Sequence, residues 1–116
     1  MYLVRDIMYC KPGKARPMVE KFIAVSKAGE KMGMGSMRVM TDVSAERYWT
    51  VVAETEVTSL EQHAEMSRKA MQMPEFQEAM KGYHDLVAEG RRETTNLRIS
   101  AASAHSAPYR VRPCNG

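Results

Sequence analysis

The stretch that most constrains the fold of this chain is residues 74–99, PEFQEAMKGYHDLVAEGRRETTNLRI. Its first half places apolar side chains on one face of a 3.6-residue helix, at Phe76, Met80, Tyr83 and Val87. Gly90 is predicted to end this helix, because glycine adopts the left-handed conformation at little steric cost. From Arg91 to Ile99 apolar and polar residues alternate, which is typical of a strand. The stretch therefore predicts an amphipathic helix that leads directly into a strand.

The preceding residues show the same two periodicities. Alternation predicts strands over residues 2–9, 36–42 and 47–57, and helical spacing predicts helices over residues 15–32 and 59–73. Pro74 separates the second helix from the one that follows it. The order is strand, helix, strand, strand, split helix, strand. This is the βαββαβ order of a ferredoxin-like α+β fold, a four-stranded antiparallel sheet with helices on one face.

The helix over residues 59–73 carries a clear start signal. Ser59 is a good N-cap, and Gln62 completes a capping box with it. The residues expected on the inner face of this helix are Leu60, Ala64, Ser67 and Met71.

The sheet face away from the helices is expected to need a cover. Both residue sets of the strand over 47–57 are half apolar, so periodicity leaves open which set faces the helices. A two-fold homodimer that packs two such faces together would bury them and enclose a cavity. Residues 1–99 are predicted to form this domain. Residues 100–116 are rich in small side chains and are predicted to form an extended arm on the same domain or on the partner subunit.

Composition excludes several classes of protein. With 116 residues the chain is one domain, and no apolar run is long enough to suggest a membrane span. The net charge is +3, but basic residues are interleaved with acidic ones, so a nucleic-acid partner is not expected. The first ten residues lack the apolar centre of an export signal, and two cysteines are too few for a disulfide scaffold. The expected location is cytoplasmic.

Three residues are candidates for catalysis: Glu54, His63 and His84. Both histidines could act as an acid or base near neutral pH, with a structural or solvent-facing role as the alternative. If Glu54 lies inside, it needs a raised pKa or an arginine partner, for which Arg5, Arg38 and Arg92 are the candidates. A structural salt bridge is the alternative for Glu54.

A pocket between sheet and helices is predicted to be lined by Trp49, Tyr83 and Arg92. The eleven methionines of the chain suit either a soft core, the favoured interpretation, or an adaptable ligand pocket. No metal is expected, because the three histidines lie far apart without a second ligand at helical spacing. No cofactor is expected either, since Gly33 and Gly35 lack the strand and the lysine of a phosphate loop.

Four segments carry a resemblance to a known superfamily: Glu54 on the third strand, residues 59–63 (SLEQH), residues 74–76 (PEF) and residues 90–93 (GRRE). With the element order, they resemble the dimeric α+β barrel superfamily, which includes antibiotic-biosynthesis-monooxygenase-like and NIPSNAP-like domains. The resemblance implies an acidic residue late in the third strand and a histidine early in the next helix, which Glu54 and His63 match. Val57 stands where such monooxygenase-like domains often have an aromatic residue.

Two functions from different classes follow. The first is a pocket for a small apolar molecule in a cofactor-free oxygenase or isomerase. The alternative is a non-enzymatic dimeric binding or stress-associated domain, whose interior polar groups are structural. A cavity large enough for a ligand, with His63 or Glu54 exposed inside it, favours the first function, and a filled interior favours the second.

Overall fold

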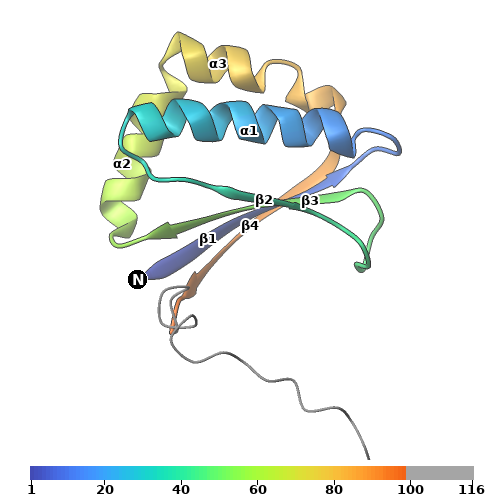
Figure 1. The fold of residues 1–116 in the computed structure, drawn as a ribbon, viewed down its shortest axis with the longest axis horizontal. Helices are drawn as coiled ribbons and strands as arrows, with labels where there is room; N and C mark the ends of the chain where they lie inside the picture. Colours follow the sequence, from blue (N-terminus) through green and yellow to red (C-terminus); the bar gives the residue numbers. More distant parts are fainter. Residues whose placement is uncertain (99–116) are drawn as a thin grey trace, which may run out of the picture.

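The computed structural model of the chain describes residues 1–98. Its elements are β1 (Tyr2–Cys10), α1 (Ala15–Lys31), β2 (Arg38–Thr41), β3 (Thr50–Val57), α2 (Leu60–Met71), α3 (Pro74–Met80), the 3₁₀ turn η1 (Tyr83–Asp85) and β4 (Val87–Asn96). The four strands form one antiparallel sheet in the order β2-β3-β1-β4. Figure 1 shows the helices on one face of this sheet. The predicted ferredoxin-like fold is therefore confirmed.

Two predictions concern features that residues 1–98 of a single chain do not contain. The arm predicted for residues 100–116, and its junction at residue 99, lie outside the described residues. The predicted two-fold dimer also stays a prediction, although Figure 1 shows that the second face of the sheet has no helix over it. Within residues 1–98, no helix combines the length and the apolar character needed to cross a bilayer.

The main core lies where α1 crosses the centre of the sheet. Met18 and Phe22, one helical turn apart on α1, pack against Val51 and Ala53 of β3. Met18 and Val51 are fully buried. Burial of an apolar side chain of this size stabilises a fold by roughly 1.5–3 kcal/mol. The buried residues of α1 therefore recur at the helical spacing predicted for residues 15–32.

A second cluster joins the three helices at one end of the molecule. It consists of Ala28 from α1, Ala70 from α2 and Phe76 from α3, all buried. The small side chains at positions 28 and 70 let the helices approach closely, and Phe76 fills the space between them. This contact fixes the rotation of α2 about its own axis.

The rotation of α2 differs from the prediction. Ser59 caps the helix as expected, since its Oγ accepts a hydrogen bond from the Gln62 N–H at 3.2 Å. However, Leu60 and Ala64 are exposed and do not lie on the inner face, and Met71 is 74% exposed, with only part of its side chain turned inward. The inner face contains Ser67 as predicted, together with His63 and Ala70. The periodicity was correct, but the packing of Ala70 against its neighbours selects a different stripe.

The helix predicted from Pro74 to Gly90 is much shorter. It ends at Met80, and Gly82 adopts the left-handed conformation with φ of +79°. The following strand, predicted to begin at Arg91, begins at Val87 because Val87 pairs with Cys10 of β1. Gly90 lies within that strand. A Cβ at this position would stand 3.0 Å from the Met8 Sδ, so glycine here permits close packing and does not end a helix.

The two strands of the β2–β3 hairpin are also shorter than predicted. They cover Arg38–Thr41 and Thr50–Val57, where residues 36–42 and 47–57 were expected. The Asp42 carboxylate accepts a hydrogen bond from the Thr50 N–H at 3.0 Å, which closes the connection. Trp49, just before β3, has a φ of +64°, which is incompatible with strand geometry. The connection therefore includes the first residues that alternation had assigned to the strand.

Two glycines provide opposite tests of this fold. Gly82→Ala is expected to reduce the free energy of unfolding by about 1–2 kcal/mol, because alanine is strained at positive φ. Gly29→Ala is expected to increase it by up to about 1 kcal/mol, because alanine favours the helical conformation. A Cβ at Gly29 would meet the Met34 Cβ at an ordinary 3.6 Å. Urea unfolding followed by circular dichroism measures both changes. A Gly82→Ala protein as stable as the wild type would contradict the position of the helix end.

Candidate functional site

A cavity of about 400 Å³ lies between the helix-covered face of the sheet and the three helices. Its floor comes from β1, β3 and β4, and its walls come from α1, α2 and α3. Most of the lining is apolar, with Val4, Phe22, Val25, Phe76 and five of the eleven methionines (Met8, Met34, Met37, Met71 and Met80). Methionine thus serves in both places that composition left open, with Met18 in the core and these five side chains at the cavity.

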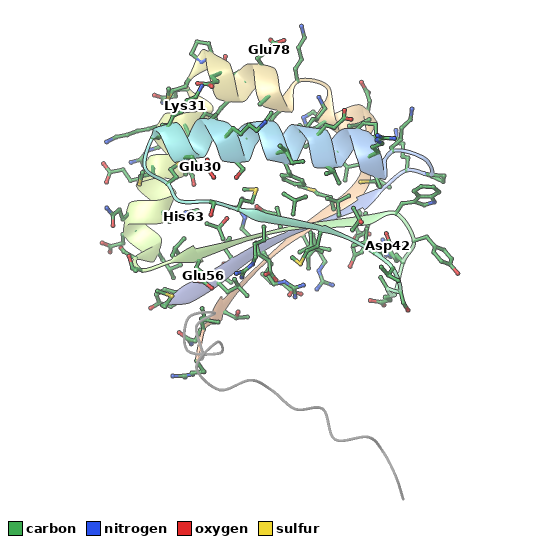
Figure 2. The ribbon with its side chains drawn as sticks, in the orientation of Figure 1. Glu30, Lys31, Asp42, Glu56, His63 and Glu78 are labelled. Atoms are coloured by element: carbon green, nitrogen blue, oxygen red, sulfur yellow. The ribbon has the colours of Figure 1, made fainter. Side chains whose placement is uncertain are left out.

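Three ionisable side chains with strong hydrogen-bonding groups line one side of this cavity: Asp6, His63 and Arg92. They come from β1, α2 and β4, which are distant in sequence. The fold brings them together because β1 and β4 are neighbouring strands and α2 crosses the same end of the sheet. Figure 2 shows His63 on the side of α2 that faces the sheet.

Asp6 and Arg92 form a two-point ion pair across the β1–β4 ladder, where they are direct register partners. The Arg92 Nε donates to the Asp6 Oδ1 at 2.6 Å, and the Nη2 donates to the Oδ2 at 3.3 Å. This hydrogen bond raises the pKa of Arg92 above its ordinary value. The Asp6 side chain is 20% exposed and that of Arg92 is 62% exposed. The arginine therefore reaches toward the open side of the cavity, while the carboxylate lies deeper.

His63 lies in the first turn of α2, which Ser59 caps, and the backbone N–H of His63 donates to the Ser59 carbonyl at 3.1 Å. Partial burial lowers the pKa of His63 below 6.5, and the positive charge of Arg92 lowers it further. The Asp6 carboxylate acts in the opposite direction and raises this pKa. At pH 7 the imidazole is therefore neutral, and one of its ring nitrogens is free to accept a proton.

Glu54 lies on the opposite face of the sheet from His63. Its carboxylate is 15% exposed and pairs with Arg5 at 3.0 Å and with Arg38 at 3.1 Å. Arg5 also approaches Glu93 of β4 at 3.8 Å, so one row of alternating charges crosses all four strands. Figure 2 shows the neighbouring Glu56 on this same side, away from His63. The structure thus separates Glu54 from His63, and its contacts are those of a structural ion-pair network.

The other residues that the sequence proposed for the site lie in different parts of the structure. Tyr83 and Arg92 line the cavity. His84 is exposed and does not line it, although its ring lies against that of Tyr83, with the centroids 3.9 Å apart and the planes tilted by 34°. Trp49 is 42% exposed in the hairpin connection, outside the cavity. Its left-handed backbone turns the chain before β3 begins, which is why the strand alternation misplaced it.

Asp6 is the site residue that sequence reasoning did not select. It interrupts an apolar set on β1, where Val4 and Met8 flank it on the same face. A carboxylate in such a set requires a partner, and that requirement was the available signal. The partner, Arg92, is 86 residues away in the chain, so only the β1–β4 pairing identifies it.

The described part of the chain, residues 1–98, contains no group of three or more His, Cys, Asp or Glu side chains placed to hold a metal ion. Cys10 is a free, buried thiol in the core, and burial raises its pKa. A thiol in this setting is a poor nucleophile.

Comparison with known proteins identifies the fold. No protein-family model matches the sequence, and no curated protein matches it. Among solved structures, an uncharacterised NIPSNAP-like domain protein from Burkholderia xenovorans has a TM-score of 0.70 at 20% identity, over 85% of this chain and 87% of that one. The chain shares the ferredoxin-like fold of NIPSNAP-like proteins.

Two further solved structures have the same fold. A NIPSNAP family protein from Agrobacterium tumefaciens has a TM-score of 0.69 at 14% identity, over 88% of this chain and 95% of that one. A structure described as an antibiotic biosynthesis monooxygenase has a TM-score of 0.62 at 9% identity, over 84% of this chain and 98% of that one. At these identities the likeness establishes the fold alone, so the function has to be argued from the cavity.

The pKa of His63 offers a direct test of the site's electrostatics. Arg92→Gln is expected to raise this pKa because it removes a nearby positive charge, and Asp6→Asn is expected to lower it because it removes a negative one. NMR titration of the imidazole measures both shifts. In the wild type, the unfolded chain protonates His63 at a higher pH than the folded chain does. The free energy of unfolding should therefore decrease as the pH falls below about 6.5.

The His63→Gln variant serves as the control for this pH dependence. It should lose the part of the dependence that is due to His63. A wild-type pKa at or above 6.5, or shifts of the same sign in the Asp6 and Arg92 variants, would contradict the arrangement described above.

Proposed function

We propose that the protein binds a small, mainly apolar molecule in this cavity and acts on it by proton transfer at His63, as an isomerase or a cofactor-free oxygenase. The observation that carries the proposal is the convergence of a neutral histidine and an ion pair on one wall of a mainly apolar cavity. Small-molecule sites typically combine a largely apolar lining with a few polar groups placed together.

The size and lining of the cavity support binding. Its volume of about 400 Å³ falls within the ordinary range of ligand pockets. Methionine side chains are flexible and polarizable, so the five in the lining could adapt to ligands of irregular shape. Phe22 and Phe76 offer flat apolar surfaces at the buried side. These properties favour a ligand with a compact apolar body, such as one or two rings.

The state of His63 supports proton transfer. Its neutral ring could remove a proton from an acidic C–H or O–H group of the ligand, which leaves the electron pair on the ligand as an enolate or a related anion. The guanidinium of Arg92, which already influences His63, would stabilise that anion. An isomerase would return the proton at another carbon. An oxygenase would let the electron-rich anion reduce molecular oxygen.

The comparisons agree with this proposal but do not single it out. One neighbour of the same fold is described as an antibiotic biosynthesis monooxygenase. The NIPSNAP-like neighbour from Burkholderia xenovorans is described as uncharacterised. A non-enzymatic binding domain is the alternative. It requires the same cavity to bind a ligand without proton transfer.

Binding and chemistry require separate experiments. For binding, the neutral fluorescent probe N-phenyl-1-naphthylamine is expected to bind the wild-type protein. Ser67→Phe should abolish this binding, because it places a ring inside the cavity. Glu65→Phe adds the same ring on the exposed side of α2 and should leave binding intact. Equal binding by both variants would place the probe elsewhere and contradict the assignment of the site.

For chemistry, the test is hydrogen–deuterium exchange at the acidic C1 position of 2-tetralone in D₂O, followed by proton NMR. Wild-type protein is expected to accelerate the exchange above the buffer rate, and His63→Gln is expected to remove the acceleration. If the probe binds but His63→Gln exchanges as fast as the wild type, the proposed proton transfer is wrong. Probe binding with no acceleration at all would favour the non-enzymatic alternative.

A further inference from the structure

We infer that the cavity selects ligands in which an apolar body carries a single carboxylate, and that Arg92 binds this carboxylate. This inference deepens the proposed function and rests on ligand binding in the same cavity. It follows from the hydrogen-bonding groups that remain available on Arg92 and from the position of this residue relative to the apolar lining.

Arg92 has more hydrogen-bond donors than its ion pair with Asp6 uses. An arginine guanidinium carries five N–H donors in a planar fork. Two of them, on the Nε and the Nη2, are directed to Asp6. The other three have no protein acceptor among the described residues, and the side chain is 62% exposed at the edge of the cavity. A ligand carboxylate could accept two of these donors at once, which is the geometry that arginine recognises best.

The negative charge of the described lining is confined to one residue. Asp6 is the only acidic residue among the described residues that line the cavity, and both of its oxygens already accept hydrogen bonds from Arg92. A cationic ligand would have to break this pair to find a partner. A neutral ligand would leave the spare donors of Arg92 to water. An anionic ligand uses them without disturbing the pair.

The arrangement along the cavity also suits an amphipathic acid. Arg92 lies on the edge strand β4, where the cavity meets solvent. The aromatic rings of Phe22 and Phe76 lie at the buried side, with 4% and 8% exposure. A ligand whose apolar body lies against these rings could therefore keep its carboxylate at the partly hydrated entrance. This placement lowers the cost of transferring the charged group from water.

Binding of a carboxylate should also favour protonation of His63. The ionisable groups that line the cavity around it are Asp6 on β1, Arg92 on β4 and Tyr83 on η1. The lining residues from α1, α3 and β3 carry no ionisable side chain. A new negative charge beside Arg92 would offset the positive charge that disfavours the imidazolium. By reciprocity, the carboxylate should bind more tightly at pH 6 than at pH 8.

The test compares 1-naphthylacetate with 1-naphthylacetamide by isothermal titration calorimetry. The two ligands share one ring system and differ in the charge of the headgroup. The wild-type protein is expected to bind the carboxylate about tenfold more tightly than the amide, the size expected for hydrogen bonds between charged groups. Arg92→Gln is expected to remove this preference while the affinity for the amide stays the same. Asp6→Asn is expected to enlarge it, since it removes the competing acceptor charge.

Arg91→Gln is the matched control. Arg91 neighbours Arg92 on β4 but points to the other face of the sheet, where it pairs with Glu93. The variant should keep the wild-type preference. If Arg92→Gln alone leaves Asp6 unpaired and fails to fold, the double variant Asp6→Asn, Arg92→Gln removes both charges and should bind the two ligands equally.

The outcomes separate this inference from the proposed function. Equal affinity for carboxylate and amide in the wild type, or a preference that survives Arg92→Gln, overturns the inference and leaves the proposed function intact. Binding of N-phenyl-1-naphthylamine without binding of the carboxylate likewise overturns the inference and leaves the proposed function intact. If none of the three ligands binds, the proposed function fails, and the inference fails with it.

Discussion

The register of the central strand β1 is the constraint on which the rest of the structure depends. β1 pairs with β3 on one side and with β4 on the other, and successive residues point to opposite faces. Arg5 consequently joins the charged row on the face without helices, while Asp6 meets Arg92 under the helices. A shift of one residue would exchange these two side chains. It would place a carboxylate in the charged row and an arginine in the core-facing layer.

The two sides of the sheet therefore carry different electrostatics from similar residues. On the open face, Glu54 has two arginine partners, which leaves it no unpaired charge with which to act. On the covered face, one carboxylate and one arginine pair beside a histidine that burial keeps neutral. The two faces differ because Arg92 keeps N–H donors that no described residue accepts, and because the His63 imidazole keeps a nitrogen that can accept a proton. These groups face a cavity, and for that reason this side is the candidate site.

Much of this arrangement could be predicted from the sequence. The order of elements followed from periodicity, and the start of α2 followed from Ser59, because both depend on residues that are close in the chain. His63, Tyr83 and Arg92 were predicted as site residues from their type and position, and all three line the cavity. The features that local patterns could not predict are those fixed by tertiary contacts. Packing of Ala70 sets the rotation of α2, and pairing with Cys10 draws Val87 into a strand.

Glu54 illustrates the same limit for function. Its type and its strand position are those of an acidic site residue, but the face to which it points depends on the whole sheet. Asp6 shows the converse, since its importance depends on a partner that lies 86 residues away in the sequence. The most direct test of the account is a crystal structure of the protein with N-phenyl-1-naphthylamine. The account predicts the probe between α2 and the sheet, in contact with His63. A probe bound on the open face, over Glu54 and Arg38, would contradict it.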